Sequence, residues 1–294
     1  MRNIITLGLS LLVSSQALAL EVVTSIKPIQ LIANEITGDI TKPKSIVSTN
    51  ASPHDYALKP SDLKALQSAD LVVWFGHGLE PFLESAVKQS KNVLQIDQIE
   101  GLELRDFDGD SHKDHHGHDH GSVDPHFWLG PDQVAIVSEN IASQLSDIDP
   151  QNEAKYQANL AAFLQSLEKE TKQIAVRLQP VSNKQYYVFH DAYGYFEDEF
   201  GLTPKGHFTV SPERKPGAKT LIKIRTALRN EDIACVFSEP QYTPAVVDSV
   251  MRGSKAQRGV LDPLAIDIAV EQGGYVAFLN QLATSYEECL TVKN

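Results

Sequence analysis

Short apolar runs alternate with amphipathic helix patterns along most of this chain, and this alternation constrains the fold more than any other feature. The runs are rich in β-branched residues and apolar throughout, as buried strands of a parallel sheet are. Such alternation predicts an α/β fold. The predicted strands cover residues 21–26, 45–48, 71–75 and 92–96 in the first half and 185–189, 206–210, 233–237 and 258–261 in the second.

Helix patterns fill the intervals between these strands. Ser61 is the expected N-cap of the second helix, since a serine side chain can accept a hydrogen bond from a free N–H of the first turn. The predicted helices cover residues 29–36, 61–67, 80–88, 131–145, 192–200, 217–229 and 244–251, and a last one begins near Tyr275.

One much longer helix separates the two halves of the chain. It begins at Asp149-Pro150 and ends at Pro180, and its apolar side chains recur at helical spacing. Roughly 30 residues at 1.5 Å each span about 45 Å, which is long enough to brace two lobes. We predict two lobes with parallel sheets, residues 20–148 and 181–294, joined by a rigid helix over residues 149–180. An ordinary surface helix is the alternative.

The first 19 residues have the pattern of a cleavable secretory signal. Arg2 precedes an apolar run over residues 4–13, and residues 17–19 (ALA) form the small-x-small pattern that precedes cleavage. The run is shorter than the roughly 20 residues that a membrane-spanning helix needs. No cysteine follows the leader, so a lipid anchor is excluded. We expect a soluble, exported, monomeric protein that begins near Leu20.

The chain has two cysteines, Cys235 and Cys289. In an oxidising compartment they most simply form a disulfide. It would close a loop of about 54 residues, for which the chain-entropy estimate is roughly 4 kcal/mol of stabilisation, less any strain. Two buried thiols are the alternative. Neither cysteine belongs to a C-x-x-C pattern, which argues against redox catalysis and against thiolate ligands for zinc.

Acidic side chains outnumber basic ones, 38 to 26, and the formal net charge is −12. A surface of this sign repels nucleic acid and anionic lipid, so we expect neither nucleic-acid binding nor direct membrane insertion. The negative charge has two equally good explanations, solubility of an exported protein and attraction of cations.

The stretch from Asp106 to Trp128 has the most unusual composition in the chain. A cluster of imidazoles and carboxylates cannot build an apolar core, so we expect a solvated loop over residues 106–123. Its most economical use is to bind a transition metal, and the alternative is a spacer with incidental affinity. The loop histidines are His112, His115, His116, His118 and His120.

A second set of candidate ligands follows the carboxyl ends of predicted strands. In open parallel sheets, the loops that leave these ends form the ligand crevice. Each side chain taken alone is more often an ordinary polar residue, and Glu239 has the alternative role of bracing a loop. Their common placement nevertheless predicts a metal site in the cleft between the lobes. The candidates at strand ends are His54, His190, Glu239 and Asp262, and His126 joins them where the long loop re-enters ordered structure before Pro131.

The ligand types favour zinc as the metal. Neutral imidazole suits the tetrahedral zinc shell, whereas hard cations such as manganese prefer shells rich in carboxylates. Copper binds more tightly than zinc in the same affinity series, so ligand chemistry alone excludes copper poorly.

Five motifs mark these positions: residues 51–56 (ASPHDY), 59–62 (KPSD), 124–128 (DPHFW), 189–196 (FHDAYGYF) and 261–263 (LDP). In this order they resemble the zinc-binding periplasmic components of ABC importers, the ZnuA type. The resemblance covers nearly the whole mature chain, and it includes the His/Asp loop and the two cysteines.

The resemblance implies one metal held between two α/β lobes that a rigid long helix joins. At the matching positions, the zinc imidazoles are His54, His126 and His190, and Asp262 is a carboxylate near the metal. Manganese-binding relatives carry an acidic residue where His190 stands, which supports zinc here. Some zinc members have a glutamate where this chain has Pro53, so the fourth ligand is either Asp262 or water.

The function that the resemblance implies is that of a non-enzymatic periplasmic receptor. It would capture Zn²⁺, deliver it to an ABC permease with a small movement, and bind extra zinc more weakly at the His/Asp loop. Three histidines and an open position also describe catalytic zinc, so an exported hydrolase is one alternative. A surface adhesin with a metal site is the other.

Overall fold

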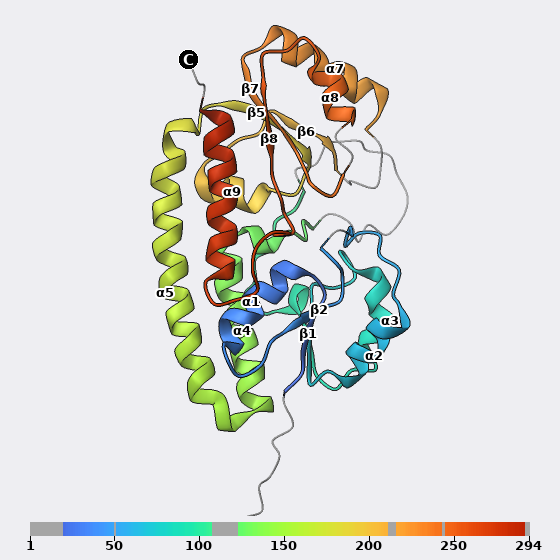
Figure 1. The fold of residues 1–294 in the computed structure, drawn as a ribbon, viewed down its shortest axis with the longest axis vertical. Helices are drawn as coiled ribbons and strands as arrows, with labels where there is room; N and C mark the ends of the chain where they lie inside the picture. Colours follow the sequence, from blue (N-terminus) through green and yellow to red (C-terminus); the bar gives the residue numbers. More distant parts are fainter. Residues whose placement is uncertain (1–19, 50, 108–122, 211–215, 243–244, 292–294) are drawn as a thin grey trace, which may run out of the picture.

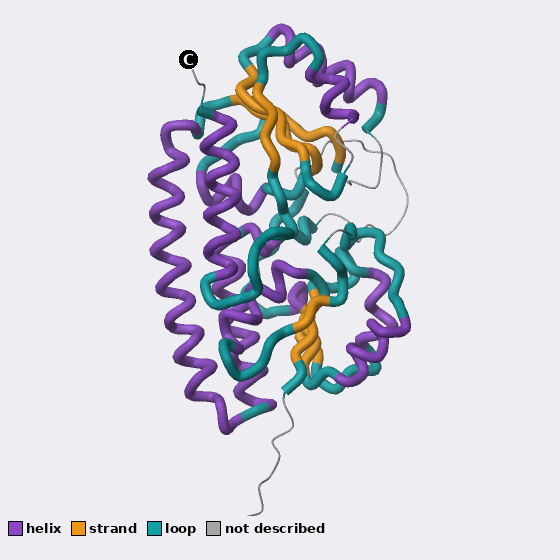
Figure 2. Tube along the Cα trace, in the orientation of Figure 1, coloured by secondary structure: helices purple, strands orange, loops and turns teal. Residues whose placement is uncertain are grey.

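The computed structural model describes residues 20–49, 51–107, 123–210, 216–242 and 245–291. The predicted leader and the five loop histidines lie outside these ranges. The described chain forms two lobes, each built on a four-stranded parallel sheet (Figures 1 and 2). The predicted α/β architecture with two parallel sheets is confirmed.

The N-terminal sheet has the strand order β2-β1-β3-β4, and the C-terminal sheet has the equivalent order β6-β5-β7-β8. All of the pairings are parallel. The strands are β1 (Val22–Thr24), β2 (Lys44–Ser45), β3 (Leu71–Trp74), β4 (Val93–Gln95), β5 (Gln185–His190), β6 (Gly206–Thr209), β7 (Ile233–Ser238) and β8 (Gln257–Val260).

Strand β2 is shorter than the predicted strand over residues 45–48. It lies at the edge of the sheet and ends at Ser45. The next two residues are buried and still donate backbone hydrogen bonds to the β1 side, from Ile46 to Thr24 and from Val47 to Ser25. The apolar run over residues 45–48 therefore indicates burial, but the chain beyond Ser45 no longer has regular strand geometry.

Short helices cover the outer face of each sheet. In the N-terminal lobe these are α2 (Pro60–Ser68) and α3 (Glu84–Val87), and in the C-terminal lobe α7 (Ala218–Asn230) and α8 (Ala245–Met251) (Figure 1). Each outer layer has its own small apolar cluster against the sheet.

Two of the predicted helix details are wrong. The N-cap of α2 is Lys59, because Pro60 fits the first helical position, and Asp62 accepts the Lys59 N–H at 2.8 Å. Ser61 therefore lies inside the helix. The single helix predicted over residues 80–88 is a 3₁₀ turn, η1 (Pro81–Leu83), followed by one turn of α3.

A further layer of helices runs along both lobes. It contains α1 (Lys27–Thr37), α4 (Pro131–Ile148), α5 (Glu153–Leu178) and α9 (Gly274–Leu290). Helix α5 has 26 residues, about 39 Å at 1.5 Å per residue, and it lies alongside both sheets (Figure 1). One continuous apolar core joins this layer to both sheets. The two lobes therefore share one hydrophobic core along this layer of helices.

Helix α9 also bridges the lobes, although its place in the sequence assigned it to the C-terminal lobe. At its start, Glu35 of α1 accepts the backbone N–H groups of Gly273 at 2.9 Å and Tyr275 at 3.1 Å. At its other end, the Cys235–Cys289 disulfide ties α9 to β7, as predicted. Among the described residues, none of the helices is both long and apolar enough to cross a membrane.

Candidate metal centre

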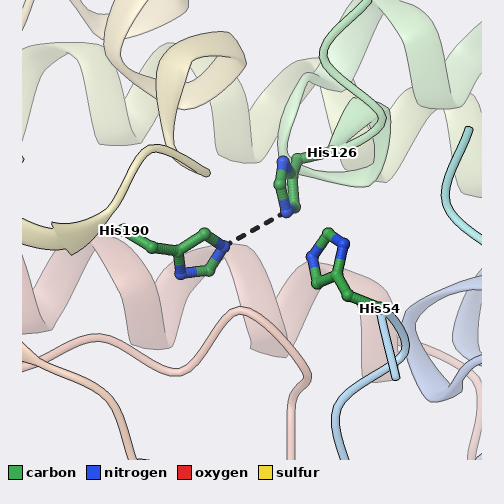
Figure 3. A group of neighbouring side chains, drawn as sticks. All are labelled: His54, His126 and His190. Atoms are coloured by element: carbon green, nitrogen blue, oxygen red, sulfur yellow. Dashed lines mark hydrogen bonds between the residues drawn. The ribbon is translucent and has the colours of Figure 1, made fainter. Parts of the chain in front are cut away.

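Three of the predicted ligands meet between the two lobes (Figure 3). His54 lies in the loop after β2, His126 immediately precedes the 3₁₀ turn η3 (Phe127–Leu129), and His190 is the last residue of β5. One ring nitrogen from each lies within 4.8 Å of the other two, and in the described part of the chain no other group of His, Cys, Asp or Glu meets this condition.

Nε2 of His126 and Nε2 of His190 lie 3.3 Å apart. In a tetrahedral zinc site with Zn–N distances of about 2.0–2.1 Å, neighbouring nitrogens are about 3.3 Å apart. The two imidazoles, joined by the dashed line in Figure 3, therefore already have the separation of two zinc ligands.

A buried carboxylate fixes the orientation of His190. Glu239, the residue after β7, accepts a hydrogen bond from Nδ1 of His190 at 2.7 Å, and both residues are less than 5% exposed. Because an ionised carboxylate only accepts, Nδ1 carries the proton and Nε2 offers its lone pair to the cleft. Glu239 is thus a support for a candidate ligand.

Asp124 supports His126 in the same way. Its Oδ1 accepts both the backbone N–H of His126 at 3.0 Å and the ring Nδ1–H at 2.7 Å. Burial raises the pKa of Asp124 to about 7, although the His126 N–H and the Arg105 guanidinium act in the opposite direction. A divalent cation on the other side of the ring would favour the ionised carboxylate further.

His54 differs from the other two histidines because it is only half-buried. Its ring centroid lies 5.6 Å from that of His126 and 6.1 Å from that of His190. Its backbone N–H donates to Oγ of Ser52 at 3.2 Å. The third imidazole therefore faces the other two from an irregular loop of the N-terminal lobe.

The cavity at this point is very small, about 10 Å³, which is roughly the space of one water molecule. Side chains from both lobes line it, among them Pro53, Trp128, Tyr242 and Leu264. Apolar and aromatic walls around three nitrogen donors give a site that fits one ion.

Asp262 does not belong to the three-histidine group. One carboxylate oxygen accepts from the Gln241 side chain at 2.8 Å and from the Leu264 N–H at 3.0 Å, and the other accepts from the Ile266 N–H at 2.5 Å. In this structure the side chain holds the turn that follows β8. Its role as a metal ligand stays a prediction.

The supporting role of two carboxylates was missed in the sequence. From the sequence, Glu239 is only a candidate ligand or a loop brace, and Asp124 has no predicted role of its own. A signal existed for Asp124, because an acidic residue two positions before a histidine can reach both the backbone N–H and the ring. The pairing of Glu239 with His190 spans 49 residues and depends on the strand order.

Comparisons with known proteins identify the family of the chain. The profile of the family described as "zinc-uptake complex component A, periplasmic" (ZnuA) matches residues 22–289. The high-affinity zinc uptake system proteins ZnuA of Yersinia pestis and Haemophilus ducreyi are 41% and 40% identical, each over 92% of this chain and over 91% and 93% of the relative. A crystal structure of a ZnuA deletion mutant with zinc bound is 30% identical and superposes with a TM-score of 0.78, covering 94% of this chain and all of the other. The chain belongs to the ZnuA family of periplasmic zinc-uptake components.

Proposed function

We propose that this chain is a periplasmic receptor that binds Zn²⁺ through His54, His126 and His190 and delivers it to an ABC permease. The single observation that carries the proposal is the convergence of three imidazoles from both lobes on an ion-sized cavity. The ZnuA relatives are named as components of a high-affinity zinc uptake system, which supports zinc as the cargo.

The fourth position on the metal is open to water or to Asp262. The three hydrogen bonds that Asp262 accepts support water, because ligation by Asp262 would compete with the contacts that hold its own turn. A water ligand leaves by simple exchange. Release of zinc to the permease would then require only that the imidazoles separate.

We assign the receptor role in preference to an enzymatic one. Pockets for organic ligands are usually about 300–1,000 Å³, and the cavity beside the histidines is about 10 Å³. The continuous core along α5 and α9 supports a small movement on release, not a wide opening of the lobes. The leader over residues 1–19, a monomeric state and weaker zinc binding by the five loop histidines are parts of the same proposal.

The test uses the zinc-loaded mature chain and its permease in lipid nanodiscs. The receptor role predicts that the zinc-loaded chain stimulates ATP hydrolysis by the permease more than the metal-free chain does. Turnover of an ester or a β-lactam that is lost in His190→Ala would overturn it in favour of a hydrolase. Zinc-independent binding to a matrix protein, without effect on the permease, would overturn it in favour of an adhesin.

A further inference from the structure

The base of the His/Asp loop is part of the described structure, and it has a defined geometry. Asp106 and Val123 form an antiparallel bridge, and the backbone N–H of Asp124 donates to the carbonyl of Arg105 at 2.7 Å. We call residues 105–107 and 123–124 the stem. The stem ends at Asp124, the carboxylate that orients His126.

A helix of the C-terminal lobe clamps both sides of this stem. Tyr195 lies on α6 (Gly194–Phe200), and its hydroxyl accepts the backbone N–H of Arg105 and donates to the backbone carbonyl of Asp124, both at 2.8 Å. The tyrosine is 5% exposed. One phenol oxygen therefore bridges the two chain segments of the stem.

Arg105 ties the stem to the same helix through its side chain. Its Nε donates to Asp198 at 2.7 Å, and its Nη1 lies 3.6 Å from Oδ2 of Asp124. A Cβ on Gly194 would lie 2.2 Å from Nη1 of Arg105. Any side chain at position 194 would displace the guanidinium. The glycine therefore leaves the space beside α6 that the Arg105 side chain occupies.

We propose that Tyr195 and Arg105 are positioning residues for zinc binding, acting through Asp124 on His126. This inference rests on the proposed function of the three histidines. The backbone of Asp124 is fixed by Tyr195, and its carboxylate lies beside Arg105 and holds both N–H groups of His126. The stem of the His/Asp loop is then also part of the tight site, independently of what the loop histidines bind.

The test compares Tyr195→Phe with a matched control, Tyr156→Phe. Tyr156 is also buried and also hydrogen-bonded, through its hydroxyl to Asp149 at 2.9 Å, but it lies on α5 outside the site. Loss of a supporting contact to a metal ligand costs about 10–100-fold in affinity, so we expect Tyr195→Phe to weaken zinc binding about tenfold. Tyr156→Phe should bind zinc as tightly as the wild type. Chelator competition measures the affinities, and the Tm of each metal-free variant reports stability separately.

A double-mutant cycle shows whether Tyr195 acts through Asp124. In an Asp124→Ala background, Tyr195→Phe should cause no further loss of zinc affinity, since interacting residues are not additive. Arg105→Met should behave as Tyr195→Phe does, and long-range ¹H–¹⁵N spectra should show His126 losing its single Nδ1–H tautomer in both.

The positioning role would be overturned if Tyr195→Phe bound zinc as tightly as the wild type does. It would also be overturned if Tyr195→Phe caused the same loss of zinc affinity in the wild-type and Asp124→Ala backgrounds. Failure of the proposed function looks different, because the wild type and Tyr156→Phe would then also lack a tight zinc site.

Discussion

The two lobes hold their parts of the candidate metal centre in different ways. In the C-terminal lobe, His190 ends β5, an inner strand between β6 and β7, and its ring is bonded to a buried glutamate at the end of β7. In the N-terminal lobe, His54 follows β2, an edge strand of two residues, and is half-buried. The difference lies in the position of the preceding strand in the sheet.

An inner strand fixes its last side chain from both sides, whereas an edge strand leaves the following loop with fewer contacts. His126 also lies in the N-terminal lobe, yet it is as buried as His190, and each of these two rings is bonded to a carboxylate. The two form a preformed pair of candidate ligands. His54 completes the site from the less buried side. We infer that the pair determines where zinc binds and that His54 contributes mainly to how tightly the ion is retained.

The largest contrast is expected between His190→Ala and His54→Ala. Both remove an imidazole, so both should weaken zinc binding by more than the 10–100-fold that loss of a supporting group costs. Without zinc the stabilities of the two variants should differ, because His190→Ala removes the Nδ1–H that the buried Glu239 accepts. Loss of this hydrogen bond lowers the free energy of unfolding by about 1–3 kcal/mol, and each kcal/mol lowers Tm by about 2–4 °C. Calorimetry on the metal-free variants measures this difference, and equal Tm values would contradict the comparison.

A smaller effect is expected when the support is changed and the ligand is kept. Glu239→Ala should reduce zinc affinity about 10–100-fold, because the orientation and tautomer of His190 are no longer fixed. Glu239→Gln should lose less, since its amide oxygen can still accept the Nδ1–H. Glu80→Gln is the matched control, because Glu80 is a buried glutamate of the N-terminal lobe that accepts the backbone N–H groups of Phe75 and Gly76 and bonds none of the three histidines. Chelator competition would contradict this account if Glu80→Gln weakened binding as much as Glu239→Ala.

The smallest effect concerns stability and pH and does not involve the metal. Burial raises the pKa of Glu197 to about 8, and Glu197 accepts hydrogen bonds from Tyr186 and Tyr286 in the C-terminal lobe. Between pH 4.5 and 8 the folded state binds more protons at this site than the unfolded state, so the stability that Glu197 contributes falls as pH rises. Glu197→Gln should therefore weaken the fall in Tm between pH 5 and 8. An unchanged pH profile of the metal-free protein would exclude a raised pKa.

Much of the fold is predictable because burial leaves a local pattern. The apolar runs predict the eight strands of the described residues to within a few positions, and the stripe from Tyr156 to Leu178 predicts α5. The residues at which helices begin are harder to predict, because they depend on backbone geometry. Pro60, not Ser61, begins α2, and the helix predicted over residues 80–88 starts at Pro81 as a 3₁₀ turn.

The candidate site was partly predictable for a related reason. Strand ends located His54 and His190, and the DPHFW motif located His126, because these positions are local properties of the sequence. The bridging position of α9 was not predictable, since it depends on Glu35 accepting N–H groups about 240 residues away. The clamp of Tyr195 on the stem is long-range in the same way.

The central claim is that the tight zinc site is the three-histidine centre and not the His/Asp loop. The most direct measurement is a calorimetric zinc titration of three proteins: the intact mature chain, a chain without residues 111–120, and His126→Ala. We predict that the loop deletion keeps one tight binding event and loses only weaker ones, whereas His126→Ala loses the tight event and keeps the weaker ones. Loss of the tight event on loop deletion, with the event retained in His126→Ala, would contradict the account.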